Sequence, residues 1–268
     1  MTEEPSLDQV TEFNRAAWDG KVQSSNQWTV PVSAEKIARA RNGEPHIVLT
    51  PIKPVPLEWM APLADKDVLL LAGGGGQQAP LVAAAGARVT TLDNSSLQLK
   101  QDEQVARREG LEIRTVLGKM QDLSMFDDAS FDLIVHPCSN CFTPNVREVW
   151  SEAYRVLRVG GSLLSGFNDP LRYIFDYDEY ENGNLVARHK IPYSDLEDMS
   201  PETRKQLIDE GEALEFGHSL NDQIGGQIDA GFVLAGFYTD NFGDQKDAIS
   251  PLIDTFMATR AMKMADPS

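Results

Sequence analysis

The chain has 268 residues, of which 41% are hydrophobic, and a formal net charge of −17. This length and composition suit one large α/β domain with insertions, and the acidic balance argues against nucleic acid and anionic membranes as partners, because both are bound through clustered Lys and Arg. No apolar stretch approaches the roughly 20 residues that span a bilayer, and residues 1–5 lack the basic and apolar regions of a signal peptide, so we expect a cytoplasmic protein.

Strand and helix signals alternate between about residues 52 and 168, which is typical of a parallel sheet flanked by helices. In chain order, helices are expected at residues 13–19, 56–63, 80–85, 96–109 and 146–157. Strands are expected at residues 68–71, 88–92, 113–117, 131–135 and 162–166. Ser95 or Ser96 can cap the helix 96–109, and Gly110 is expected to end it. Gly160 and Gly161 are expected to end the helix 146–157, which precedes the strand 162–166.

The first strand runs directly into a glycine-rich turn. The apolar residues 68–71 are followed by Ala72 and then by the four glycines 73–76. Glycine has no Cβ and can adopt positive φ, so such a turn lets a ligand approach the backbone, and the next helix directs its free N–H groups at that ligand. The pattern indicates a site for an adenosine-containing cofactor.

Asp93 lies 17 residues after Gly76, at the end of the second predicted strand. In a doubly wound sheet this position faces the ribose of a nucleotide bound over the glycine turn. The alternative is a carboxylate that satisfies backbone N–H groups at the start of the next helix.

The stretch 65–167 resembles the class I S-adenosylmethionine-dependent methyltransferases of the type 11 kind. The segments that carry the resemblance are the strand, glycine turn and helix, and residues 91–93, 117–123, 131–135 and 154–161. The last two are the most discriminating, because the family commonly has Phe-Asp before an apolar strand and a helix that ends in Leu-Arg-x-Gly-Gly. Residues 231–238 and 256–263 are similar to its sixth strand and its final antiparallel strand.

The resemblance implies an α/β fold with a doubly wound, mainly parallel, Rossmann-like sheet of seven strands and an antiparallel last strand. A single domain, 1–268, is expected, and its parts are an N-terminal helical cap (1–55), a cofactor-binding core (56–169), an insertion over the active site (170–211) and a C-terminal helix with the last two strands (212–264). In the family such an N-terminal extension covers the site, so Trp18 and Trp28 are candidate lid and substrate residues, with plain packing as the alternative. Tyr173 in the insertion is a candidate for the acceptor pocket, although aromatic residues also hold insertions to a core.

The implied cofactor is S-adenosyl-L-methionine. The residues expected to bind it are Ala72, Gly73, Gly74, Gly76, Gln77, Gln78, Asp93, Asn94, Met120, Gln121 and His136. Three positions depart from the family pattern: Leu70 stands where an acidic residue is usual, Ala72 stands where the first glycine is usual, and Lys119 stands where a carboxylate normally helps to hold adenine. The turn is therefore expected to hold the cofactor mainly through its backbone, with Met120 packing on the adenine ring.

Methyl transfer from a sulfonium needs a base only when the acceptor must lose a proton. His136, at the end of the fourth strand, is the first candidate for a base or a cofactor contact, with a satisfied structural histidine as the alternative. His218 is a second candidate for a catalytic role, and Asn140 could orient an acceptor or bond its own backbone.

Cys138 and Cys141 form a C-x-x-C motif, which invites a redox or zinc interpretation. A zinc site needs further ligands, and the four histidines are scattered, so no metal is expected. The simpler interpretation is two small apolar residues beside a pocket.

The sequence therefore predicts methyl transfer from S-adenosylmethionine to a small-molecule acceptor by in-line displacement. The alternatives are a cofactor-binding protein of this fold without turnover, an NAD-dependent oxidoreductase that uses the same turn and Asp93, and an empty fold that binds a partner through its acidic insertion. The oligomeric state is left open.

Overall fold

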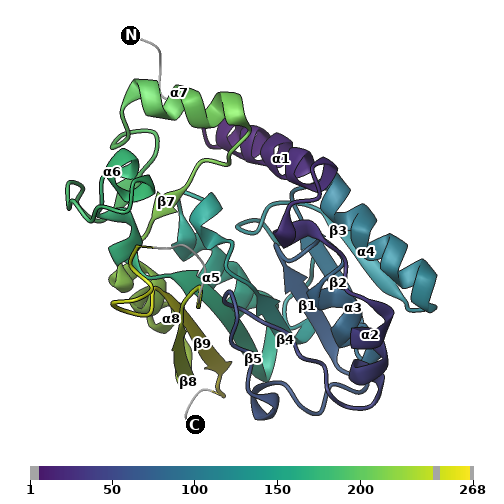
Figure 1. Cartoon of the computed structure of the whole chain (residues 1–268). Coiled ribbons are helices and arrows are strands. Elements are labelled where there is room, and N and C mark those ends of the chain that lie inside the picture. Colours follow the sequence, from purple (N-terminus) through teal and green to yellow (C-terminus); the bar gives the residue numbers. More distant parts are fainter. Residues whose placement is uncertain (1–5, 244–247, 266–268) are drawn as a thin grey trace.

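The computed structural model describes residues 6–243 and 248–265, and its centre is a seven-stranded sheet with the order β3-β2-β1-β4-β5-β9-β8 (Figure 1). Its strands are β1 Asp67–Leu71, β2 Arg88–Asp93, β3 Ile113–Leu117, β4 Phe131–His136, β5 Leu157–Asn168, β8 Phe232–Asp240 and β9 Phe256–Lys263. The first five run parallel to one another, and β9 lies antiparallel between β5 and β8. The predicted doubly wound, mainly parallel sheet with an antiparallel final strand is confirmed.

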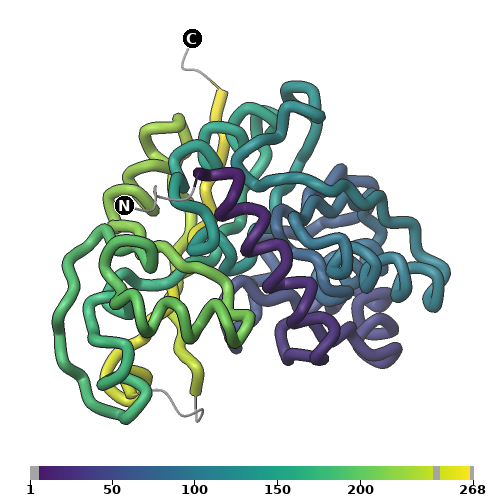
Figure 2. The backbone as a smooth tube through the Cα atoms, turned by 90° about the horizontal axis from the view of Figure 1, so that it is seen from above, coloured from purple at the N-terminus to yellow at the C-terminus, as the bar shows by residue number. Residues whose placement is uncertain are grey.

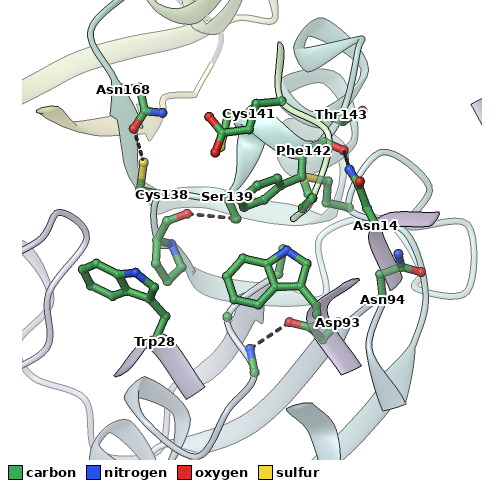
Figure 3. A pocket seen from close by; sticks show the side chains of 18 of the residues that line it. Asn14, Trp28, Asp93, Asn94, Cys138, Ser139, Cys141, Phe142, Thr143 and Asn168 are labelled. Carbon is green, nitrogen blue, oxygen red and sulfur yellow. Dashed lines mark hydrogen bonds between the residues drawn. The ribbon is translucent and has the colours of Figure 1, made fainter. Parts of the chain in front are cut away.

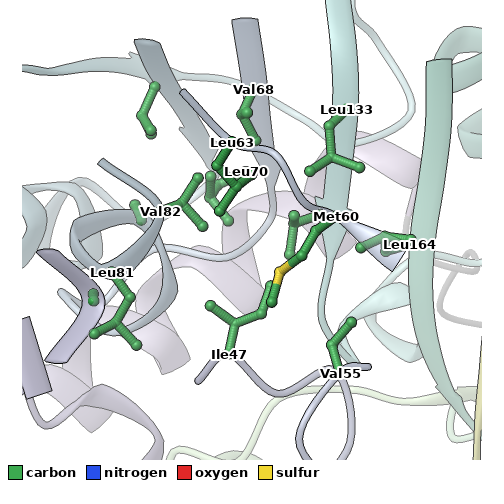
Figure 4. Packing of buried hydrophobic residues seen from close by; sticks show 14 of the residues in the cluster. Ile47, Val55, Met60, Leu63, Val68, Leu70, Leu81, Val82, Leu133 and Leu164 are labelled. Carbon is green, nitrogen blue, oxygen red and sulfur yellow. The ribbon is translucent and has the colours of Figure 1, made fainter. Parts of the chain in front are cut away.

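Helices cover both faces of this sheet. They are α1 Leu7–Gln23, α2 Ala34–Arg41, α3 Gln78–Ala84, α4 Ser96–Glu109, α5 Val146–Val156, α6 Tyr177–Glu181, α7 Pro201–Glu210 and α8 Gly226–Asp229. Side chains of β1 alternate between two hydrophobic clusters, because successive residues of a strand point to opposite faces. Val68 and Leu70 join the cluster beneath α2 and α3 (Figure 4), whereas Leu69 and Leu71 join the cluster beneath α5.

The local signals around α4 are found as predicted. Ser95 is its N-cap and its hydroxyl accepts a hydrogen bond from the Gln98 N–H at 3.1 Å. Gly110 ends the helix with φ +65°, the left-handed conformation that glycine adopts without strain. These two ends fix the length of α4 and place its N-terminus beside the end of β2.

The structure differs from the predicted elements in three places. Residues 56–63 form only the 3-10 turn Leu57–Trp59, because Pro62 lacks the backbone N–H that a helix interior needs and disfavours helical backbone in the residue before it. Helix α2 was not predicted, although Ser33 caps it and Ile37 and Ala40 are buried. Strand β5 begins at Leu157, directly after α5, so Gly160 and Gly161 lie within the strand instead of before it.

The glycine pair in β5 accompanies an irregularity in the sheet. Gly160 has φ +83°, and the pairing of β4 with β5 shifts register between Phe131 and Leu133. A Cβ on Gly161 would lie 3.0 Å from the carbonyl oxygen of Asp132. Glycine is therefore needed where the two strands approach closely, and the glycine pair that was predicted to end a helix lies at an irregular place in a strand.

The segment after β5 is more structured than a plain insertion. It holds the 3-10 turn Pro170–Tyr173, helices α6 and α7, and the strand β6 Tyr193–Ser194, which pairs antiparallel with β7 Phe216–Gly217. Seen from above, the end of α7 comes close to α1 (Figure 2), and Lys21 on α1 pairs with Glu212 just after α7.

Candidate active site

A cavity of about 390 Å³ lies at the carboxyl ends of β1, β2, β4 and β5 (Figure 3). Three parts of the chain line it: the turns after these strands, the N-terminal segment around α1 and residues 48–51, and the segment 212–215 with Phe242 and Phe256. Ligands of open α/β sheets bind at this edge of the sheet. The cavity is thus where the sequence placed the site.

The turn after β1 is held by backbone hydrogen bonds and close packing. Gly74 N–H donates to Asp93 Oδ2 at 3.0 Å, and Gly75 N–H donates to the Gln98 carbonyl at 3.0 Å. A Cβ on Gly74 would lie 2.9 Å from Gln98 Cβ, and Gly76 has φ +71°. The glycines thus form a narrow backbone cradle that a side chain would fill.

Asp93 lines the cavity and is 9% exposed. Its Oδ1 accepts the Ser95 N–H at 2.8 Å, and its Oδ2 accepts the Gly74 N–H. Burial raises the pKa of Asp93 to about 6, and backbone N–H groups of Ser95, Gly74 and Asn94 partly oppose that rise. A carboxylate has about four acceptor positions, so Asp93 can both hold the turn and bind two hydroxyl groups of a ribose.

A second buried carboxyl group, which the sequence analysis missed, supports the same turn. Asp102 on α4 is fully buried, and its Oδ1 accepts the Gly76 N–H at 3.0 Å. Burial raises its pKa well above the usual range, and the charge of Asp93 adds to that rise. Helix periodicity alone gave no signal for Asp102, because its partner is a backbone group 26 residues away.

Gln77 and Gln78 attach the N-terminal segment to the turn. Gln77 Nε2 donates to the carbonyl oxygens of Gln27 at 3.2 Å and Val30 at 3.0 Å. Gln78 Oε1 accepts the Val48 N–H at 3.1 Å. Both residues line the cavity, and their amides close its wall.

Ala72, Gly73, Asn94, Met120 and Gln121 also line the cavity. Asn94 Nδ2 donates to the Thr11 carbonyl at 2.8 Å, which ties the end of β2 to α1. Lys119 forms an ion pair with Asp8, so its ammonium group is directed at α1. The neighbouring Met120 and Gln121 are then the side chains after β3 that could contact an adenine ring.

The structure places His136 outside the cavity wall. Its ring is fully buried, Nδ1 donates to the Leu71 carbonyl at 2.8 Å, and the ring packs edge-on against Trp150. Burial lowers the pKa of His136 to about 4, against the rise that its hydrogen bond to Leu71 would give. The neutral ring carries its hydrogen on Nδ1, its Nε2 is buried without a hydrogen-bond partner among the described residues, and the residue does not line the cavity, so a role of His136 as a base or a cofactor contact stays a prediction.

His218 and Asn140 also lie outside the wall, where they hold the loop after β4. His218 Nε2 donates to the carbonyl oxygens of Asn140 at 3.1 Å and Thr143 at 2.9 Å, and burial lowers the pKa of His218. Asn140 is fully buried, with Nδ2 donating to Gln223 Oε1 at 2.9 Å. Their side chains are engaged with the protein, and we do not carry a catalytic or acceptor role forward for either.

The three aromatic candidates differ in whether they line the cavity. Trp18 and Trp28 line the cavity, and Trp18 packs edge-on against Phe142 with ring centroids 5.2 Å apart. Tyr173 stands behind the wall, where its hydroxyl contacts Glu215 and Asn168, two residues that do line it.

Helix α1 forms the cover of the cavity through Thr11, Asn14, Trp18 and Lys21. Asp19 Oδ1 accepts the Ser95 hydroxyl at 2.5 Å and the Leu97 N–H at 3.2 Å, so α1 also caps the N-terminus of α4. On the other side, Lys21 pairs with Glu212 at 2.6 Å. The helix therefore spans from the glycine-turn end of the cavity to its far end.

An acceptor pocket under the insertion was predicted, but most of the residues that line the far end of the cavity were not among the predicted site residues. The residues that line it are Phe142, Asn168, Arg172, Glu215, Phe242 and Phe256, together with Cys138 and Cys141. Both cysteines are free thiols, and burial raises the pKa of Cys138 to about 12. Cysteines with raised pKa are weak nucleophiles, so the observed arrangement is that of small residues beside a pocket.

Two negative observations complete the description. Within residues 6–243 and 248–265, no group of three or more His, Cys, Asp and Glu side chains could hold a metal ion. In the same ranges, no helix has the length and apolar character needed to cross a bilayer.

Comparison with known proteins agrees with this geometry. Residues 69–165 match a family model described as a methyltransferase domain. The chain is 51% identical over 258 residues to the uncharacterized methyltransferase YbaJ of Bacillus subtilis (strain 168), an alignment that covers 96% of this chain and 100% of that protein.

Solved structures share the fold. A putative S-adenosylmethionine-dependent methyltransferase from Listeria monocytogenes has a TM-score of 0.60 at 16% identity, over 85% of this chain and 100% of that one. The 1,6-didemethyltoxoflavin-N1-methyltransferase of Burkholderia thailandensis, solved with S-adenosylhomocysteine, has a TM-score of 0.59 at 14% identity, over 99% of this chain and 93% of that one. The strand order, the cradle beside Asp93 and the close relative agree, and the chain belongs to the class I S-adenosylmethionine-dependent methyltransferases.

Proposed function

We propose that this enzyme transfers the methyl group of S-adenosylmethionine to a small-molecule acceptor held in the same cavity. The observation that carries the proposal is one covered cavity of about 390 Å³ with two chemically different ends. One end is the glycine cradle with Asp93, and the other is lined by aromatic residues and by Asn168, Arg172 and Glu215. A cavity of this size, enclosed by α1, suits a small acceptor better than a protein or a nucleic acid.

The residues at the first end fit the cofactor. The backbone of residues 73–76 would hold its amino acid portion, Asp93 its ribose hydroxyls, and Met120 with Gln121 its adenine. Asn94 and Ala72 complete that wall, whereas Gln77 and Gln78 hold the N-terminal segment against it. We also propose that residues 1–55 act as the cap and that the segment from 170 to 211 helps to enclose the acceptor; residues 1–5 of the cap lie outside the described part of the chain.

When bound, the cofactor supplies a methyl group that is already activated by a positively charged sulfur. The task of the protein is then to hold the acceptor in line with that methyl group and to exclude water. Trp18 and Trp28 contribute further apolar surface to the cavity. Proximity in this covered space would supply most of the rate enhancement.

Names of relatives support a small acceptor. A sarcosine/dimethylglycine N-methyltransferase of Halorhodospira halochloris is 33% identical over 89 residues, which cover 32% of this chain and 31% of that protein. The Burkholderia enzyme was solved with bound 1,6-didemethyltoxoflavin. The formal charge of −17 further disfavours nucleic acid as the acceptor, and we propose a cytoplasmic location.

Calorimetry and product analysis test this function. S-adenosylmethionine and S-adenosylhomocysteine should bind the purified protein, and NAD should not. Incubation with trideuteromethyl-labelled S-adenosylmethionine and a protein-free extract of bacterial cells should yield a labelled small molecule by mass spectrometry. Tight NAD binding without S-adenosylhomocysteine binding would contradict the proposal, and so would label that appears only on added protein or RNA.

A further inference from the structure

The far end of the cavity contains a carboxylate in a defined hydrogen-bonded setting. Glu215 lies between α7 and β7 and lines the cavity together with Asn168, which ends β5. Phe142, Phe242 and Phe256 line the same cavity, and the last two rings pack against Arg172, whose charge acts on Glu215. A carboxylate in such surroundings is costly unless it has partners or a function.

A chain of hydrogen bonds fixes one oxygen of this carboxylate. Cys138 Sγ donates to Asn168 Oδ1 at 3.0 Å, Asn168 Nδ2 donates to the Tyr173 hydroxyl at 2.5 Å, and Tyr173 donates to Glu215 Oε2 at 2.7 Å. Because Asn168 donates to Tyr173, the single hydroxyl hydrogen of Tyr173 is directed at Glu215. Within the described part of the chain, no hydrogen-bond donor is found on Oε1, and this oxygen is left to accept a hydrogen from a ligand in the cavity.

The charges around Glu215 set how readily it takes a proton. Burial raises the pKa of Glu215, and the hydroxyl of Tyr173 and the charge of Arg172 partly oppose that rise. Glu212 raises it further, and Lys21 lowers it. Other titratable groups that face it are Asp195, which accepts the Glu215 N–H at 2.7 Å, and the thiols of Cys138 and Cys141.

Arg172 is already engaged at this end. Its Nη1 donates to the Thr255 hydroxyl at 3.1 Å, and its guanidinium carbon lies 5.0 Å from the Phe242 ring centroid and 5.1 Å from that of Phe256. The guanidinium therefore forms part of the wall. An acidic acceptor would meet the Glu215 carboxylate there, and like charges in a poorly solvated space repel strongly.

From this geometry, and resting on the proposed function, we infer that Glu215 is the catalytic base and that the acceptor presents an N–H or O–H group to it. In the step, the lone pair of that nitrogen or oxygen forms the new bond to the methyl carbon. The bond between this carbon and sulfur breaks with its electron pair remaining on sulfur. The proton of the acceptor passes to Glu215 Oε1 and later to solvent. Tyr173 is a positioning residue, since it acts through Glu215.

Glu215→Gln tests the inference, because it keeps the shape of the side chain and removes its ability to take a proton. Glu210→Gln is the matched control, since Glu210 is an exposed acid on α7 whose side chain contacts Gln206. Each variant is incubated with labelled S-adenosylmethionine and the same cell extract, and its S-adenosylhomocysteine affinity is measured by calorimetry. We expect labelled product to form roughly 10²–10⁴-fold more slowly in Glu215→Gln, with cofactor affinity unchanged, and at the normal rate in Glu210→Gln.

The position of the label gives an independent test. Tandem mass spectrometry should locate the trideuteromethyl group on nitrogen or oxygen, and a label on carbon or sulfur would overturn the inference. Tyr173→Phe removes a donor that favours the charged carboxylate, so the acidic limb of turnover should move to higher pH. Normal turnover in Glu215→Gln would contradict the role of Glu215 as base and leave the proposed function intact. Wild-type protein that forms no labelled small molecule would contradict both the proposed function and the role of Glu215.

Discussion

The side-chain amide of Asn14 pairs with both backbone groups of Leu214, a residue 200 positions later in the chain. Asn14 Nδ2 donates to the Leu214 carbonyl at 3.0 Å, and Asn14 Oδ1 accepts the Leu214 N–H at 2.8 Å. The same Nδ2 donates to the Phe142 carbonyl at 3.1 Å. Asn14 is only 3% exposed, so these bonds lock the cover of the cavity to its far wall.

Asn14→Ala should release α1 from that wall. It leaves buried backbone groups of Leu214 without partners, and we expect a loss of about 1–3 kcal/mol in the free energy of unfolding. Amide hydrogen exchange in α1 should become faster, and S-adenosylhomocysteine should dissociate more rapidly. Glu12→Gln, on an exposed position of α1, is the control. Unchanged exchange in α1 would show that the helix is held by other contacts.

Asp93→Asn should weaken cofactor binding. The amide retains an oxygen for one backbone donor but loses the charge that strengthens hydrogen bonds to hydroxyl groups. Hydrogen bonds to charged groups contribute about 1.5–3 kcal/mol each, so the affinity for S-adenosylhomocysteine should fall roughly 10- to 100-fold. Calorimetry measures this directly, and an affinity equal to that of the wild type would remove Asp93 from the ribose site.

The raised pKa of Asp93 also predicts a pH dependence of stability in the ligand-free protein. The pKa is about 6 when folded and near 3.8 otherwise, so the folded state binds the proton more tightly. This contribution to stability is present below pH 3.8 and is lost as the pH rises through 6. Across that window the wild type should therefore lose up to roughly 3 kcal/mol relative to Asp93→Asn. Urea unfolding of both proteins at several pH values gives the difference, and a constant difference would contradict the assignment.

Gly74→Ala and Gly20→Ala form a matched pair. A Cβ on Gly74 would lie 3.0 Å from Asp93 Oδ2 and 2.9 Å from Gln98 Cβ, whereas a Cβ on Gly20 meets nothing within 4 Å. Gly74→Ala should destabilise the protein by about 1–3 kcal/mol and abolish measurable cofactor binding, because the cradle must move. Gly20→Ala, inside α1, should stabilise it by roughly 0.5–1 kcal/mol. Normal binding by Gly74→Ala would mean that the cradle tolerates a side chain.

The glycine-turn end of the cavity was predictable because its parts are short and local. Each of the strands β1 and β2 carries its functional residues directly at its end, and parallel strands bring these ends together. The interpretation of Asp93 as a carboxylate that holds backbone donors was also sound, since it accepts the N–H groups of Gly74 and Ser95.

The far end of the cavity was not predictable in the same way. Phe142, Asn168, Glu215 and Phe256 come from segments far apart in the sequence, and only packing brings them to one wall. The interest in His136 and His218 followed from residue type, which does not reveal that both imidazoles are buried and bonded to backbone carbonyls. Gly160 and Gly161, which lie in β5, were predicted to end a helix. Glycine occurs both at helix ends and at irregular places in a strand, so the sequence alone did not distinguish the two.

The position of α1 ties both ends of the cavity to one structural element. Its Asp19 is bonded to the start of α4, and its Asn14 and Lys21 are bonded to the opposite wall, so one helix lies across both ends. We therefore expect a change that loosens α1 to speed the exchange of cofactor and of acceptor together, because both exchanges would respond to the motion of the same helix.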